Sequence, residues 1–150
     1  MIKMENAKPS ELKELIPILK EAYKVHNIFS KSEKDIEKYM KGLEGTWAVA
    51  KNEKGKIVAG CFVGKKGNLW RVKHLGVAKK FQNMGVGSTL LAYCEQVLIK
   101  KGMIEVHVSE KDPEELNFFN ENGYTITDEV EGYHRPREMC FFLQKSVGGR

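Results

Sequence analysis

Residues 74–91 read HLGVAKKFQNMGVGSTLL, and within this stretch the chain changes from the pattern of a strand to that of a helix. The strand pattern ends at Val77, and a short polar turn leads to a helix start that Gly85 and Gly87 bracket. The first turn of a helix leaves backbone N–H groups unpaired and carries the positive end of the helix dipole. The junction is therefore a ready binding site for an anion.

The composition of the turn indicates which anion fits. The two glycines leave room for oxygen atoms to approach the amides, and Lys79 and Lys80 add positive charge nearby. We predict a pyrophosphate held by the backbone amides of residues 82–88. The spacing excludes a Rossmann fingerprint, because position 90 is Leu where a third glycine belongs, and no Walker Gly-Lys-Ser/Thr follows.

Apolar periodicity predicts the elements on either side of this junction. Pro17 lies inside the first helical pattern, so we expect a kink or break near Ile16. Ser32 can cap the second helix. The expected elements are a strand over 2–6, helices over 10–25 and 32–43, strands over 46–50, 56–64 and 69–77, a helix over 85–101, a strand over 103–109, a helix over 113–122, and strands over 124–130 and 139–145.

The composition excludes several protein classes. The chain has 150 residues, a formal charge of +5 and 41% apolar residues, which fits one domain over residues 1–146 with a frayed tail at 147–150. No apolar stretch approaches the roughly 20 residues that cross a bilayer, and the first residues lack a signal-peptide pattern. We therefore expect a cytoplasmic protein without a membrane partner. No metal-ligand spacing is present, so we expect no metal site and three reduced core cysteines, at positions 61, 94 and 140.

The complete pattern, Leu-Gly-Val, a basic turn and Gln-x-x-Gly-x-Gly opening an amphipathic helix, resembles the acetyl-CoA signature of the GNAT superfamily of N-acetyltransferases. The order of elements is similar along the whole chain. The resemblance implies an α/β (α+β) fold: a mixed seven-stranded sheet that splays between strands 4 and 5, with about four helices. It also implies an enzyme that moves an acetyl group from acetyl-CoA to a primary amine by direct attack in a ternary complex.

The resemblance implies a set of residues that bind the cosubstrate acetyl-CoA. The pantetheine arm would pair with the backbone of the fourth strand, and main-chain groups of the signature would bind the pyrophosphate. The fourth-strand residues are Leu75, Gly76 and Val77, and the signature residues are Gln82, Asn83, Met84, Gly85, Val86, Gly87 and Ser88.

The catalytic groups depart from the family pattern. Phe119 stands where the family often has a tyrosine that protonates the departing thiolate, so either Tyr124, Tyr133 or solvent would supply that proton. An ammonium has no lone pair with which to attack a thioester, so a base is needed. Some family members carry a glutamate where this chain has His107, whose ordinary pKa of about 6.5 suits a base. The alternative interpretation is a strand residue without a catalytic role.

The acceptor amine is less well defined by the sequence. Arg71 and Lys73 stand where other family members carry acidic or histidine bases, so they favour an acceptor with a carboxylate or phosphate, unless they are surface charge. Strand alternation places His74 on the opposite face. Tyr133 lies between the last two strands, where acceptor pockets of the family are often lined, although it also fits a plain hairpin loop. A protein amine stays open as the acceptor, as does a monomer or a homodimer.

Two other functions remain open. The missing tyrosine favours a non-catalytic acyl-CoA-binding or regulatory module. The basic charge would suit a nucleic-acid-binding domain, but Trp70 and Phe81 are the only aromatic candidates among the lysines, which disfavours nucleic acid as a partner.

Overall fold

The computed structural model describes residues 1–24 and 26–149. Its strands and main helices follow the expected order along the chain. The elements are β1 (Lys3–Asn6), α1 (Leu12–Ala22), α2 (Glu33–Gly42), β2 (Thr46–Lys51), β3 (Ile57–Lys66), β4 (Leu69–Val77), α3 (Val86–Tyr93), β5 (Gly102–Ser109), α4 (Pro113–Glu121), β6 (Thr125–Glu131) and β7 (Met139–Val147), with short helical turns at Pro9–Glu11, Asn27–Ser30 and Lys79–Phe81 and a π-helical turn at Cys94–Ile99.

The seven strands form one mixed sheet in the order β1-β2-β3-β4-β5-β7-β6. Every neighbouring pair is antiparallel except β4 and β5, which are parallel. The mixed seven-stranded sheet with four helices confirms the fold class expected from the sequence.

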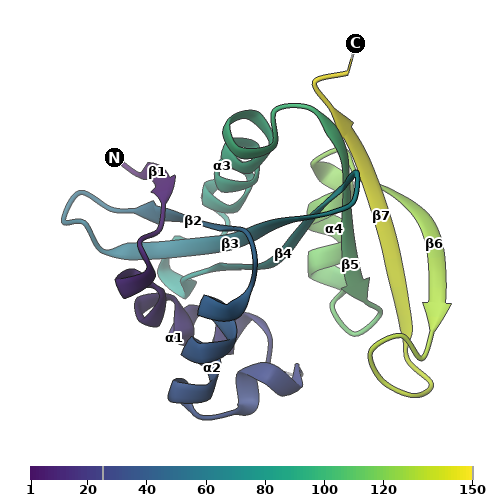
Figure 1. Cartoon of the computed structure of the whole chain (residues 1–150), viewed down its shortest axis with the longest axis horizontal. Helices are drawn as coiled ribbons and strands as arrows, with labels where there is room; N and C mark the ends of the chain where they lie inside the picture. Colours follow the sequence, from purple (N-terminus) through teal and green to yellow (C-terminus); the bar gives the residue numbers. More distant parts are fainter. Residues whose placement is uncertain (25, 150) are drawn as a thin grey trace.

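The sheet divides between β4 and β5 (Figure 1). Parallel pairing joins only Leu69–Arg71 to Met103–Glu105, whereas β5 stays paired with β7 as far as Ser109. The backbone edge of β4 beyond Arg71 is therefore free of β5. Such an edge presents unpaired N–H and C=O groups that an extended ligand can use.

A β-bulge in β4 decides which of its side chains face the α1–α2 side of the sheet. Gly60 pairs with Gly76 and Phe62 with Lys73, so two residues of β4 stand opposite Cys61. His74, at the bulge, has a φ of 58°, which non-glycine residues rarely adopt. Its ring lies against Phe29, Tyr39 and Trp47, on the face covered by α1 and α2. The prediction that His74 faces away from Arg71 and Lys73 is wrong, because the bulge breaks the strand alternation.

Two apolar cores lie on the two faces of the sheet. One core packs α1 and α2 against β2 and β3, and the other packs α3 and α4 against the opposite face (Figure 1). The first core depends on close approach between Leu15 and Gly60, since a Cβ atom added to Gly60 would lie 2.4 Å from each of the two Leu15 methyl carbons. This contact holds α1 close to the centre of the sheet.

The helices follow their sequence signals except at Pro17 and in the helix expected over 85–101, where α3 ends at Tyr93 and a π-helical turn follows to Ile99. The Ser32 side chain accepts a hydrogen bond from the Asp35 amide and caps α2 as expected. However, α1 runs unbroken through Pro17, because buried leucine and isoleucine side chains anchor it on both sides of the proline. It ends at Ala22, and the expected end at Val25 lies outside the described residues.

The carboxyl-terminal end differs slightly from the expectation, because β7 continues to Val147, one residue into the expected tail. Arg150 lies outside the described residues.

All three cysteines are free and buried, as expected. Among residues 1–24 and 26–149, no helix has the length and apolar character needed to cross a membrane.

Candidate active site

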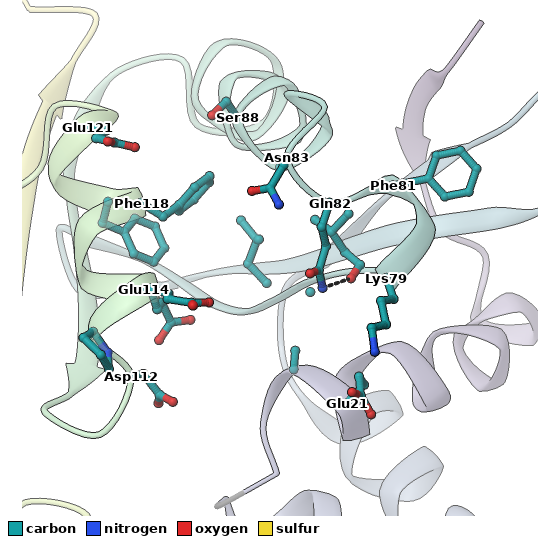
Figure 2. Close-up of a pocket in the computed structure, with 18 of the residues that line it drawn as sticks. Glu21, Lys79, Phe81, Gln82, Asn83, Ser88, Asp112, Glu114, Phe118 and Glu121 are labelled. Carbon is teal, nitrogen blue, oxygen red and sulfur yellow. Dashed lines mark hydrogen bonds between the residues drawn. The ribbon is translucent and has the colours of Figure 1, made fainter.

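A cavity of about 900 Å³ occupies the division between β4 and β5. The carboxyl end of β4 and the amino terminus of α3 form one wall, and α4 forms the other (Figure 2). Figure 2 shows Gln82, Asn83 and Ser88 facing Phe118 and Glu114 across the cavity. The cavity is therefore built around the segment from which the sequence predicted an anion site.

The two glycines at the α3 terminus have different physical roles. Gly85 is the N-cap residue with a φ of 80°, a left-handed conformation that favours glycine. At Gly87 an added Cβ atom would lie 3.3 Å from a Phe118 ring carbon and 3.4 Å from a Val77 methyl carbon. The absence of a side chain at 87 therefore keeps the cavity open between α3 and α4. The Gln82 side chain donates a hydrogen bond to the Val77 carbonyl (3.0 Å), which holds the turn against β4.

Charge is distributed unequally between the walls of this cavity. Lys79 lies on the β4–α3 side, whereas the α4 side carries carboxylates, and Figure 2 shows Glu114 and Glu121 on that helix. Phosphate groups are consequently favoured at the amides of α3 and disfavoured along α4.

A second pocket of about 220 Å³ lies on the α1–α2 side of the sheet. It is named the acceptor-side pocket below, after the predicted acceptor residues that line it. All four histidines of the chain line it, together with two basic side chains of β4 and three tyrosines. These residues are His26, His74, His107, His134, Arg71, Lys73, Tyr23, Tyr39 and Tyr133.

His107 is fixed in this pocket by both of its ring nitrogens. The Arg71 guanidinium donates to Nδ1 (2.9 Å), and Nε2 lies 2.8 Å from a Glu105 carboxylate oxygen. Because an arginine can only donate, Nδ1 accepts and the proton of the neutral ring lies on Nε2. The ring stacks on Phe142 with centroids 3.8 Å apart and meets the edge of Tyr133. Burial lowers the pKa of His107, and the hydrogen bond to Glu105 opposes this shift.

The basic side chains of the pocket make no direct ion pair in the described part of the chain, although the charge of Arg71 acts on Glu105 and Glu115 lines the same pocket. Arg71 Nε is buried and has no hydrogen-bond partner among the described residues. The Lys73 ammonium lies 5.9 Å from the centre of the Phe62 ring, and burial followed by the charge of Arg71 lowers its pKa. Within the described part of the chain, neither side chain forms an ion pair.

The two cavities meet at three residues that line both, namely Leu75, Glu115 and Phe119. The pKa of Glu115 is raised to about 7, because burial and, to a smaller extent, the charge of Asp112 outweigh a hydrogen bond from Tyr23 that lowers it. Sequence analysis missed Glu115. Its position four residues before Phe119 on an expected helix could have revealed it, because residues four apart share a helix face.

The alternative proton donors lie in different places. Tyr124 is buried and donates its hydroxyl to Glu95 (2.7 Å), and it lines neither of these two cavities. Tyr133 lines the acceptor-side pocket and is 48% exposed. Phe119 is buried against Phe118 and Tyr124 at the junction.

Most of the chain matches one known protein family. Residues 12–124 match the acetyltransferase (GNAT) family. The chain belongs to the GNAT acetyltransferase family. Membership in this family makes the protein an acetyltransferase by class. Its sheet divides between β4 and β5, beside the amino terminus of α3.

Solved structures share this GNAT fold at low sequence identity. An aminoglycoside 6′-N-acetyltransferase complexed with coenzyme A is 14% identical with a TM-score of 0.79, over 99% of this chain and 98% of that chain. Ard1 from Thermoplasma volcanium is 17% identical with a TM-score of 0.79, over 97% of each chain. The ribosomal-protein-S18-alanine N-acetyltransferase from Escherichia coli is 15% identical with a TM-score of 0.78, over 100% of this chain and 96% of that one. The comparison with curated proteins gives no match.

Most of the residues predicted from the sequence line the two cavities of this GNAT acetyltransferase. Met84 and Val86 do not: Met84 is 67% exposed, and Val86 is buried in the core beneath α3. The predicted acceptor residues Arg71, Lys73 and Tyr133 and the predicted base His107 all line the acceptor-side pocket. The predicted cofactor residues that line the larger cavity are Leu75, Gly76, Val77, Gln82, Asn83, Gly85, Gly87, Ser88 and Phe119.

His74 of this acetyltransferase gives a testable pH dependence of stability. Burial and the charges of Lys73, His26 and Arg71 lower its pKa to about 3, while an unfolded histidine has a pKa of about 6.5. Below pH 6.5 the unfolded chain therefore takes up a proton that the folded chain does not, and the free energy of unfolding falls with pH. Between pH 7 and pH 5 we expect this group alone to remove about 2 kcal/mol.

Urea unfolding of the wild type and of His74→Asn at both pH values measures this loss. Asparagine tolerates the left-handed backbone at this position, so the variant keeps the bulge. We expect the wild type to lose about 2 kcal/mol more than the variant on acidification. Equal losses would mean that His74 takes up its proton in the folded protein.

Proposed function

We propose that this GNAT protein transfers an acetyl group from acetyl-CoA to the primary amine of a small molecule that also carries a carboxylate or phosphate. The observation that carries the proposal is the buried, unpartnered Nε of Arg71 in a pocket that shares three lining residues with the larger cavity. A buried guanidinium nitrogen without an acceptor is costly, and an anionic substrate group would satisfy it.

The larger cavity fits the cosubstrate. A pyrophosphate requires a cluster of free amides and room to approach them, and the space that a Cβ at Gly87 would fill provides that room. The extended pantetheine arm matches the free edge of β4 at Leu75, Gly76 and Val77. Bound acetyl-CoA would supply an acetyl group activated as a thioester.

Direct transfer requires the amine and the thioester carbonyl to meet. The two cavities share lining residues, so an acceptor held by Arg71 and Lys73 can present its amine where the pantetheine arm ends. Catalysis by positioning is then combined with a hydrogen bond from a β4 amide, such as that of Val77, to the developing oxyanion.

The contacts of His107 bear on its predicted role as the base. His107 lines the acceptor-side pocket, but its Nδ1 lone pair already accepts from Arg71. To act as the base, this histidine would first have to lose that hydrogen bond. A role in holding Arg71 in place fits its contacts better.

Known neighbours support an amine as the acceptor. The solved structures with this fold include acetyltransferases named for an aminoglycoside, for spermidine and for the alanine of a ribosomal protein. A location in the cytoplasm and a monomeric or homodimeric state stay predictions from the sequence.

Pairs of matched amines test the substrate class. We expect purified protein with acetyl-CoA to release free thiol with O-phosphoethanolamine or β-alanine at a kcat/KM about 10-fold or more above that with ethanolamine or β-alanine amide. A hydrogen bond to a charged group contributes about 1.5–3 kcal/mol, which corresponds to about 10-fold or more. Arg71→Gln should abolish this preference mainly through KM, whereas Lys66→Gln, on an exposed residue outside both cavities, should keep it.

Two results would contradict the proposal in different ways. Equal rates with the charged and neutral members of each pair would remove the acidic group from the substrate class. Binding of coenzyme A without thiol release for every amine would instead support the non-catalytic module, which the missing hydroxyl at Phe119 favours.

A further inference from the structure

The chemistry of acetyl transfer must occur where the two cavities meet. Of the three residues that line both cavities, Leu75 and Phe119 are apolar, and Glu115 alone can exchange a proton. We propose that Glu115 accepts a proton from the acceptor ammonium and delivers a proton to the coenzyme A thiolate, an inference that rests on the proposed function. Tyr23 is the positioning residue that holds the Glu115 carboxylate.

The hydrogen bonds of Tyr23 explain how this carboxylate can take up a proton. The Tyr23 hydroxyl oxygen lies 2.8 Å from Glu115 Oε2 and 3.0 Å from the Leu75 carbonyl oxygen, yet it carries a single proton. When Glu115 is ionised, Tyr23 donates to the carboxylate. When Glu115 is protonated, it can donate to the Tyr23 oxygen, and Tyr23 then donates to Leu75. The Tyr23–Glu115 hydrogen bond therefore exists in both protonation states with its direction reversed, so proton uptake does not break this contact.

The surroundings of Glu115 place both states within reach near neutral pH. Four ionisable groups from four parts of the fold act on it or respond to its charge: Tyr23 after α1, Asp112 before α4, Cys61 on β3 and Cys140 on β7. The cations Arg71 and Lys73 and the four histidines line the same pocket, yet burial has the largest influence and the pKa of the carboxyl is raised to about 7. A general base works best when its pKa lies near the working pH.

The proton inventory of the reaction balances with this single carboxylate. Glu115 first takes one proton from the ammonium, and the free amine attacks the thioester carbon while the carbonyl electron pair moves to oxygen. The C–S bond then breaks, its electron pair leaves with sulfur, and protonated Glu115 gives its proton to the thiolate. The regenerated carboxylate takes the remaining extra proton from nitrogen and releases it to solvent, so the products are an amide, the free thiol and one proton.

The position of Glu115 compensates for the side chain at Phe119. The two residues are four apart on α4 and therefore lie on the same face, one turn from each other. A phenylalanine cannot protonate a thiolate, but the carboxylic acid one turn earlier can.

Three measurements on the full chain test the proposal. With O-phosphoethanolamine and β-alanine as acceptors, we expect Glu115→Gln to lower kcat/KM at pH 7 by about 100-fold and to leave coenzyme A affinity within about threefold. The deficit should shrink about tenfold for each pH unit toward the pKa of the amine, because the variant depends on amine that is already deprotonated. Glu14→Gln, which makes the same chemical change at an exposed position of α1, should retain the wild-type rate.

Tyr23→Phe separates positioning from catalysis. Loss of its hydrogen bond removes an interaction that lowers the pKa of Glu115, so the acidic limb of the rate profile should move to higher pH while the plateau rate falls less than in Glu115→Gln. A purely structural role for Tyr23 would leave the position of the limb unchanged and would overturn its assignment.

Carboxyl ¹³C NMR of the wild type with bound coenzyme A gives a readout that needs no acceptor and no variant. Titration of Glu115 near pH 7 supports the proposal, and titration below about pH 5 overturns it. Full activity of Glu115→Gln with an unchanged pH profile overturns it as well. Failure of the wild type to release thiol with any amine would count against the proposed function, while the NMR titration would still decide whether Glu115 exchanges a proton near pH 7.

Discussion

Replacement of Gly87 by glutamate is expected to weaken coenzyme A binding by about 1,000-fold. The new Cβ would lie against Phe118 and Val77 in the open part of the cavity, and the carboxylate would extend among the amides that face the phosphates. Loss of two charge-assisted hydrogen bonds, each about 1.5–3 kcal/mol, with added like-charge repulsion accounts for this size. Isothermal titration of each protein with coenzyme A measures the effect.

A matched glycine substitution controls for the loss of a glycine as such. Gly42 is the last residue of α2, and an added Cβ there would meet nothing within 4 Å. Gly42→Ala should therefore bind coenzyme A like the wild type. An unchanged affinity in Gly87→Glu, with a normal melting temperature, would show that the phosphates do not bind at the amino terminus of α3.

Substitution of Gly60 by valine is expected to destabilise the fold by about 3 kcal/mol or more. Its first side-chain atom would lie 2.4 Å from two carbons of Leu15, which is fully buried in α1, so helix and sheet would have to separate. Overpacking of a close-packed core usually costs about 1–3 kcal/mol, and this contact is closer than real Cβ atoms allow. Guanidinium unfolding of the wild type and the variant measures the difference.

A double-mutant cycle assigns the effect to this one contact. Leu15→Ala alone should cost about 2–5 kcal/mol through the cavity that it leaves. Gly60→Ala combined with Leu15→Ala should cost less than the sum of the two single changes, because each relieves the strain or the void of the other. Additive losses would mean that Gly60 is constrained by its backbone and not by Leu15.

The two cavities also explain why the family signature alone does not define the substrate. The backbone amides of residues 82–88 suit any pyrophosphate-bearing cosubstrate. The acceptor-side pocket is built from α2, β4, β5, α4, the segment after α1 and the loop between β6 and β7, and its charged lining residues include Arg71, Lys73 and Glu115. Acceptor preference is therefore expected to vary with these elements while the coenzyme A site stays the same.

Local sequence patterns were sufficient for the order of elements. The strand expected over 103–109 is β5, and its alternate residues Ile104, Val106 and Val108 are all buried. Gly85 and Gly87 marked the amino terminus of α3, and at Gly85 this is because the left-handed N-cap conformation is a property of the local backbone. The same holds for Ser32, whose cap reaches only three residues along the chain.

Tertiary structure decided what depends on partners far apart in the sequence. The bulge that turns His74 toward Arg71 arises from the pairing of β4 with β3, and Pro17 is accommodated because buried neighbours hold α1 in place. The contact between Tyr23 and Glu115 joins residues 92 positions apart. A pattern along the chain specifies a residue's own backbone and face, whereas the environment that sets a proton affinity is assembled only when α1, β4 and α4 pack together.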